Sequence, residues 1–107
     1  MDSRDNMELV RDFLRGQNLE QVGRVDEAID LYESAVAAGF DSSGPYDRLI
    51  ALYSHRAMHT DVVRITETAL ANVHTHTPKK EWYETMRAAA MKAQTQVPPA
   101  APKRPRQ

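Results

Sequence analysis

The sequence predicts an all-α protein made of antiparallel helical hairpins, and two observations carry this prediction. Residues 23–36 match residues 57–70 at a spacing of 34, with small or apolar residues at the same places. The matching pairs are Ala28 with Val62, Ile29 with Val63, Leu31 with Ile65, Ala35 with Ala69, and Val36 with Leu70. A fixed period near this length is typical of stacked helical hairpins, none of which can bury its apolar face alone. In addition, no window alternates polar and apolar residues in the way a strand does.

The first helix is predicted over residues 7–22, after a polar N-terminus of residues 1–6 that we expect to be flexible. Asp5 can cap this helix, and Glu8 three residues later completes a capping-box pattern. The apolar residues of the helix are spaced for one buried stripe. They are Leu9, Val10, Phe13, Leu14, Leu19 and Val22.

A second helix is predicted over residues 26–38, because Gly23 allows a tight turn before it. The helix ends at Gly39, which suits the left-handed conformation that follows many helices. Phe40 can then pack back on the last turn. Residues 7–38 are therefore expected to form the first hairpin.

The second hairpin begins at Pro45, because proline is favoured in the first turn of a helix, with Ser42 or Ser43 as the cap. The apolar side of this third helix consists of Tyr46, Leu49, Ile50, Leu52 and Tyr53. A fourth helix is predicted to begin near Thr60. Its apolar residues are Val62, Val63, Ile65, Ala69, Leu70 and Val73.

A fifth helix is predicted over residues 78–95, with Thr77 as its cap. It follows a short loop and is rich in alanine. Its large side chains place Trp82, Met86 and Ala89 on one stripe.

The helical periodicity predicts a folded domain over residues 7–95. Residues 96–107 are rich in proline and carry basic but no acidic side chains, so we expect a disordered or polyproline-like tail. The rest of the chain is net acidic, which disfavours binding to nucleic acid. There is no cysteine, and no apolar run resembles a signal peptide or a membrane span, so the expected localisation is cytoplasmic.

The run Gly23-Arg24-Val25-Asp26-Glu27-Ala28-Ile29-Asp30-Leu31-Tyr32-Glu33-Ser34-Ala35 resembles the second helix of a tetratricopeptide repeat. The resemblance implies repeats at residues 9–42 and 43–76, with residues 78–95 as the helix that covers the last repeat. It also implies a short right-handed solenoid of five helices, in which paired helices approach closely at small residues. Those positions are Gly16, Ala28 and Ala35, then Ile50, Val62 and Ala69. Because Ile50 and Val62 are large for these positions, we expect the second hairpin to pack wider or in another register.

First helices of such repeats line a concave groove, so the resemblance implies an adaptor that binds a peptide or helix of a partner protein. By resemblance the groove residues are Val10, Phe13, Gln17, Glu20 and Gln21, then Gly44, Asp47, Ala51, Ser54 and His55. Val10 and Phe13 are either the apolar end of the groove or core residues in a shifted register. Glu20 and Asp47 favour a basic or amphipathic partner.

Two related functions find less support in the residues. Some family members grip a C-terminal carboxylate with Lys and Asn at two groove positions, but those positions hold Phe13 and Gln17, then Asp47 and Ala51. The stretch from Gly23 to Ile50 also resembles the pentatricopeptide pattern of RNA-binding repeats. Two repeats and an acidic body argue against RNA binding.

Self-association is the alternative function. Two repeats are fewer than the three or so that such arrays normally need for stability, so a second copy can supply the missing interface. Tyr83, Met91 and the Ala-rich fifth helix are the candidates for this contact.

Catalysis and metal binding are not indicated. His55 and His59, and likewise His74 and His76, have spacings that can hold Zn²⁺, but no further ligand joins either pair. The sequence contains no phosphate loop, HExxH or Gly-x-Ser-x-Gly motif. We therefore expect no enzyme activity, no cofactor and no bound metal.

Overall fold

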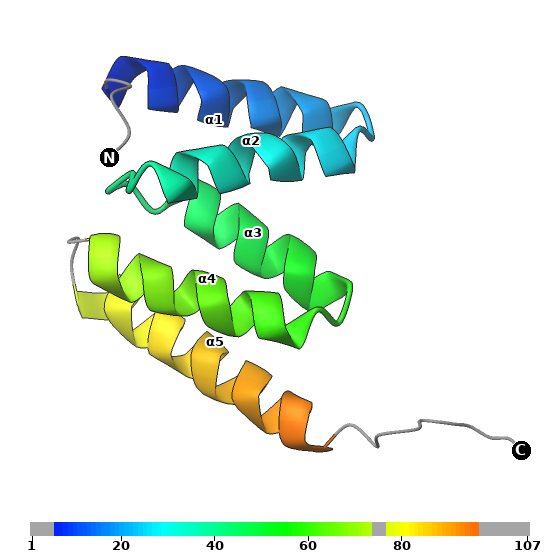
Figure 1. Ribbon diagram of the computed structural model, residues 1–107, viewed down its shortest axis with the longest axis vertical. Coiled ribbons are helices and arrows are strands. Elements are labelled where there is room, and N and C mark those ends of the chain that lie inside the picture. The colour runs from blue at the N-terminus through cyan, green and yellow to red at the C-terminus, as the bar shows by residue number, and fades with distance from the viewer. Residues whose placement is uncertain (1–5, 74–76, 97–107) are drawn as a thin grey trace, which may run out of the picture.

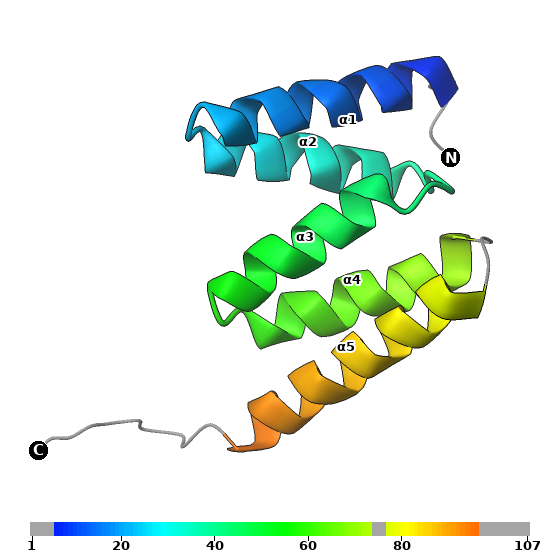
Figure 2. The same ribbon diagram turned by 180° about the vertical axis from the view of Figure 1, so that it is seen from behind.

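The computed structural model describes residues 6–73 and 77–96, which form five α-helices and no strand. The helices are α1 (Asn6–Gln21), α2 (Val25–Ala37), α3 (Gly44–His55), α4 (His59–Asn72) and α5 (Thr77–Gln96). They follow one another along the molecule, and each helix packs against the next one in the chain (Figures 1 and 2). The predicted all-α class and the five helices are confirmed, and each predicted boundary differs from the observed one by a single residue. Asp5, residues 74–76 and the tail from 97 onward lie outside the described residues.

The 34-residue period is present in the backbone of the two hairpin turns. Gly23 has a φ of 85°, and Ala57, 34 residues later, has a φ of 58°. In the first turn the amide of Arg24 donates to the carbonyl of Leu19 at 2.9 Å, and in the second the amide of Met58 donates to the carbonyl of Tyr53 at 2.9 Å. This 6→1 bond is the hydrogen bond that closes a helix at a left-handed residue. The second hairpin therefore keeps the turn of the first, although alanine replaces glycine.

The two hairpins exchange a large and a small residue. A Cβ atom added to Gly16 would lie 2.6 Å from Cε1 of Tyr32, which is fully buried. At the equivalent places in the second hairpin the large residue is Ile50 and the smaller one is Thr66, and both are fully buried. The turn remains in register, so the expectation of a shifted register at Ile50 is wrong. The bulk that Ile50 adds on one helix is matched by the smaller Thr66 on the other.

Small residues and the end of α2 follow the prediction. Ala28 and Ala35 are fully buried, as expected of positions where paired helices approach closely. Gly39 has a φ of 76°, and the amide of Phe40 donates to the carbonyl of Ala35 at 3.2 Å. Phe40 packs with Leu9 and Ala35 in a small cluster between α1 and the end of α2.

The single buried stripe predicted for α1 is wrong, because the helix has two apolar faces. Leu9 is buried, and Phe13 and Leu19 pack against the core. Val10 and Leu14 are 39% and 52% exposed, and Val22 just after the helix is 69% exposed. Each step along a helix turns by about 100°, so Leu14 lies roughly 140° around the axis from Leu9. One helix cannot bury both residues against α2.

The predicted stripe of α5 is wrong by about one residue. Tyr83 and Ala90 form the buried line of this helix, with Met86 partly buried beside them. Trp82 is 36% exposed and Ala89 is exposed. Because Tyr83 is buried, it cannot form the contact with a second copy that the sequence suggested.

Candidate functional site

The predicted groove residues lie on α1 and α3, but they differ in their surroundings. Val10, Gln21, Ala51 and His55 are exposed. The partly buried members are Phe13, Gln17, Glu20, Asp47 and Ser54. Three of these partly buried residues hold the helices together, and they are described in turn.

Phe13 joins α1 to the start of α3. A Cβ atom added to Gly44 would lie 2.5 Å from Cζ of Phe13, so the ring packs directly on the backbone at Gly44. The ring centroid of Phe13 also lies 5.8 Å from that of Tyr32, in a tilted arrangement. Of the two alternatives left open for this residue, the structure places Phe13 against the core and leaves Val10 exposed.

Glu20 is held by two partners within the molecule. Its carboxylate accepts two hydrogen bonds from the Arg48 guanidinium, at 2.9 and 2.6 Å, and one from the Tyr32 hydroxyl at 2.5 Å. The hydrogen bond from Arg48 lowers the pKa of Glu20 below its ordinary value, against the opposing effect of burial. Burial raises the pKa of Tyr32, and the nearby Glu20 carboxylate raises it further.

Asp47 is held in the same way, between α3 and α5. Lys79 Nζ lies 2.6 Å from one carboxylate oxygen, and the Tyr83 hydroxyl donates to the other at 2.9 Å. The Lys79 ammonium also lies 4.7 Å from the centre of the Trp82 ring. The negative charges of Glu20 and Asp47 are therefore balanced internally. The argument that they attract a basic partner loses its support.

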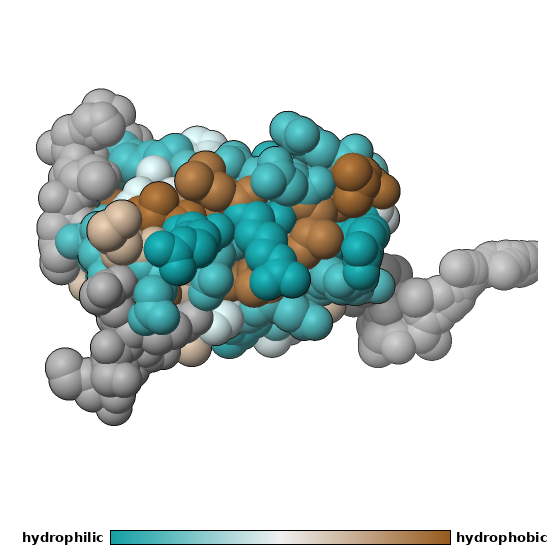
Figure 3. Space-filling view, turned by 90° about the horizontal axis from the view of Figure 1, so that it is seen from above, coloured by the Kyte–Doolittle hydropathy of each residue, from teal (hydrophilic) through white to brown (hydrophobic). Residues whose placement is uncertain are grey.

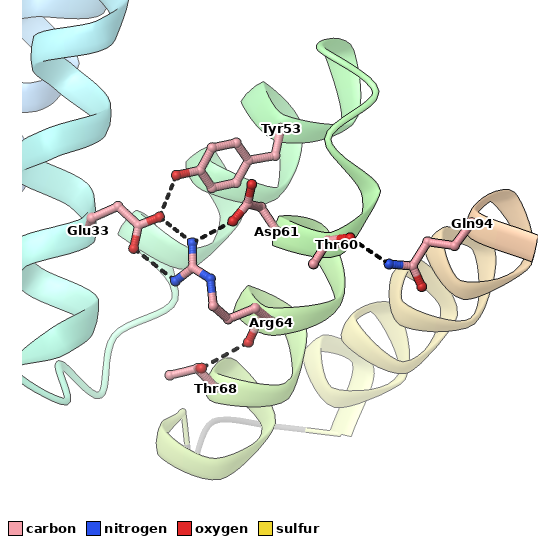
Figure 4. A network of polar contacts seen from close by, with 7 residues as sticks. All are labelled: Glu33, Tyr53, Thr60, Asp61, Arg64, Thr68 and Gln94. Atoms are coloured by element: carbon pink, nitrogen blue, oxygen red, sulfur yellow. Dashed lines mark hydrogen bonds and ion pairs between the residues drawn. The ribbon is translucent and has the colours of Figure 1, made fainter. Parts of the chain in front are cut away.

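A third polar network connects α2, α3 and α4, and the sequence analysis did not find it (Figure 4). The Arg64 guanidinium donates to both oxygens of Glu33, at 3.0 and 2.6 Å, and the Tyr53 hydroxyl donates to the same carboxylate. Burial pushes the pKa of Glu33 upward, but the hydrogen bonds from Arg64 and Tyr53 outweigh it and lower the pKa. Asp61 accepts a further bond from Arg64 at 3.0 Å.

An open hollow of about 490 Å³ lies beside this network, between α2 and α4. Its lining consists of Glu33, Val36, Ala37, Ala38, Gly39, Arg64, Thr68 and Asn72. The charged groups in this lining are Glu33 and Arg64, which already bind each other. The hollow therefore has no charged group available for a ligand.

Arginine pairing separates α1 from the other helices. Among the described residues, five arginines form ion pairs with carboxylates. The pairs are Arg24 with Glu27, Arg48 with Glu20, Arg56 with Asp26, Arg64 with Glu33, and Arg87 with Glu67. Arg11 and Arg15 are exposed, and neither forms a salt bridge or a side-chain hydrogen bond with the described part of the chain.

The exposed apolar face of α1 is the other feature of this end of the molecule. Met7 is 71% exposed, and with Val10, Leu14 and Val22 it forms a row that we call the α1 face. Figure 3 looks onto this end and shows the apolar side chains in a row with hydrophilic side chains on both sides. No described helix lies over the row, whereas α5 covers α4 at the opposite end (Figure 1). Sequence periodicity contained this signal, because residues 7, 10 and 14 follow the spacing of a second stripe.

Metal-ligand clusters are not found in the described part of the chain. No group of three His, Cys, Asp or Glu side chains there could hold an ion. His55 is exposed and His59 is partly buried, while His74 and His76 lie outside the described residues. Within residues 6–73 and 77–96, no helix is long and apolar enough to cross a membrane.

Comparison with known proteins gave no match. A scan against models of protein families, a search of curated proteins and a search of solved structures each found no significant similarity to this chain.

Proposed function

We propose that this chain is a protein-interaction module that binds a helix of a partner protein across the α1 face. The observation that carries the proposal is the row of Met7, Val10, Leu14 and Val22, which is large, apolar and exposed. Contiguous apolar surface on a small soluble domain marks a place where another molecule binds. Stacked hairpins also require a polar outer face at each end, and the α1 end lacks one.

The α1 face suits a helix better than an extended peptide. Met7, Val10 and Leu14 follow the i, i+3, i+7 spacing, which is the spacing of residues that meet a facing helix. Two helices packed in this way bury such side chains in the holes between residues of the partner. The proposed surface keeps Val10 of the predicted groove but faces the end of the stack instead of its concave side.

The proposal is tested with the full chain and two glutamate variants. Leu14→Glu places a charge in the middle of the α1 face, and Met91→Glu places the same charge on an exposed methionine of α5. Both variants are compared with the original protein by capture from a lysate of the source organism and quantitative mass spectrometry. The purified partner is then titrated against all three proteins.

Leu14→Glu is expected to weaken binding of the captured partner about tenfold or more, because the charge would be buried without a counter-ion. Met91→Glu is expected to bind like the original protein. A partner that binds all three proteins with equal affinity would disprove the α1 face as its site.

A further inference from the structure

We infer that the partner of the α1 face is an acidic amphipathic helix, whose carboxylates pair with Arg11 and Arg15. The inference rests on the proposed function, since it names the chemistry of the helix that binds at the same face. It reverses the charge of the partner suggested by the sequence, because Glu20 and Asp47 are already bound to Arg48 and Lys79.

The charge argument comes from the arginines. Five of the seven arginines in the described residues have a carboxylate partner, at distances of 2.6 to 2.9 Å. Arg11 and Arg15 have none there, although both lie on the same helix one turn apart. An arginine is charged at every physiological pH and presents a planar fork that suits carboxylates. Two such groups next to an uncovered apolar row indicate a partner with negative charges.

The positions around the helix define the shape of this partner. Met7, Arg11 and Arg15 are four residues apart and form one row along α1, so the arginines border the apolar face on one side. Gln17 and Gln21 border it on the other side, and neither carries a charge. The complementary helix has an apolar stripe, carboxylates four residues apart on one flank, and uncharged polar residues on the other flank.

The length of α1 sets the length of the partner segment. The helix has 16 residues and is therefore about 24 Å long, at about 1.5 Å per residue. An acidic helix of about four turns can match it from end to end.

A second copy of the chain fits the face less well. In an antiparallel two-fold pair of α1 helices, each flank meets the same flank of the other copy, so the arginines of both copies come together. In a parallel two-fold pair, Arg11 and Arg15 meet Gln17 and Gln21 of the second copy instead. Glu8 and Asp12, also on α1, are already engaged in interactions of their own. Neither arrangement supplies the arginines with an unengaged row of carboxylates.

The test uses three synthetic helical peptides of 18 residues with an identical apolar stripe. Their flanking row carries glutamates in the first peptide, glutamines in the second and lysines in the third. Each peptide is titrated into the full ¹⁵N-labelled chain at low salt, and amide chemical shifts give both the site and the affinity. The acidic peptide is expected to bind α1 about three to ten times more tightly than the glutamine peptide, and the lysine peptide most weakly. The difference should decrease in 0.5 M salt.

A pair of charge-reversal variants sharpens the test. In Arg11→Glu/Arg15→Glu the order of the peptides should reverse, so that the lysine peptide binds most tightly. The control is Lys80→Glu/Lys92→Glu, which changes the net charge equally on exposed residues of α5 and should keep the original order.

The outcomes separate the inference from the proposed function. Equal binding of the three peptides at α1 would overturn the acidic partner and leave the helix-binding face intact. No shift at α1 with any peptide at millimolar concentration would overturn both. A concentration-dependent dimer whose shifts lie on Met7, Val10 and Leu14, without peptide, would overturn the acidic partner in favour of a second copy.

Discussion

The two hairpins of this protein share a backbone turn and differ in what surrounds them. The α1–α2 hairpin turns at Gly23 and the α3–α4 hairpin turns at Ala57, with the same hydrogen bonds 34 residues apart. Helix α3 packs against α2 and α4, and its Leu49 and Ile50 are fully buried. Helix α1 packs against α2 and has no described helix on its other side. The repeat therefore preserves the hairpin, while the position of each hairpin in the stack decides which of its faces is exposed.

The largest expected difference concerns one leucine on the first helix of each hairpin. Leu49→Ala should lower the free energy of unfolding by about 2–5 kcal/mol, because it leaves a cavity in the core. Leu14→Ala should change it by about 0.5 kcal/mol or less, because Leu14 lies half-exposed on the α1 face. Urea titrations of both variants, with m-values compared, measure this contrast. Similar losses in the two variants would mean that the α1 face is covered in solution.

The exchange of large and small residues gives the next largest effect. Gly16→Ile alone should destabilise the protein by about 1–3 kcal/mol or more, because the new side chain would overlap the Tyr32 ring. Adding Tyr32→Thr imitates the Ile50 and Thr66 arrangement of the second hairpin. The double variant should be more stable than the sum of the single effects by about 1–3 kcal/mol. Strictly additive effects, measured by chemical denaturation, would show that the two sites do not compensate.

Acid should weaken the contacts between the hairpins, by a smaller amount. Glu20 and Glu33 belong to the first hairpin and pair with Arg48 and Arg64 of the second. Their pKa values in the folded state are lowered from the ordinary value of 4.5. This stability is present above pH 4.5 and is lost as the pH falls through the folded-state pKa values. Unfolding free energies between pH 3 and 7 should show the decrease.

Glu20→Gln/Glu33→Gln is the variant that checks this assignment. Its stability at pH 7 should be lower than that of the original protein, and its dependence on acid should be reduced. An unchanged pH profile in the double variant would assign the acid sensitivity to other carboxylates.

The smallest effects distinguish the two turns. Ala57→Gly should stabilise the protein by about 0.5–1 kcal/mol, because alanine at a φ of 58° is strained and glycine is not. Gly23→Ala should destabilise it by about 1 kcal/mol for the same reason, although no atom lies within 4 Å of the added Cβ. Thermal midpoints of the two variants should move in opposite directions. Movement in the same direction would mean that the turns are not equivalent.

Local sequence signals were sufficient for much of the fold and for little of the candidate site. Gly23, Gly39 and Pro45 act on their own neighbours, so the boundaries they predict agree with the structure. The groove residues were assigned by repeat position, and repeat position says nothing about partners on other helices. Glu20 and Asp47 were expected to be available to a partner, and both are bound within the molecule.

The sequence by itself determined the helices, the turns and the 34-residue period, because periodicity, glycine and proline act over a few neighbouring residues. Tertiary structure alone decided which of the two apolar stripes of α1 is buried, since a stripe is buried only where another helix covers it. It also decided the pairing of Glu20 with Arg48, 28 residues away, and of Asp47 with Tyr83, 36 residues away. These pairs leave Arg11 and Arg15 as the exposed charges beside the α1 face, which no local pattern could reveal.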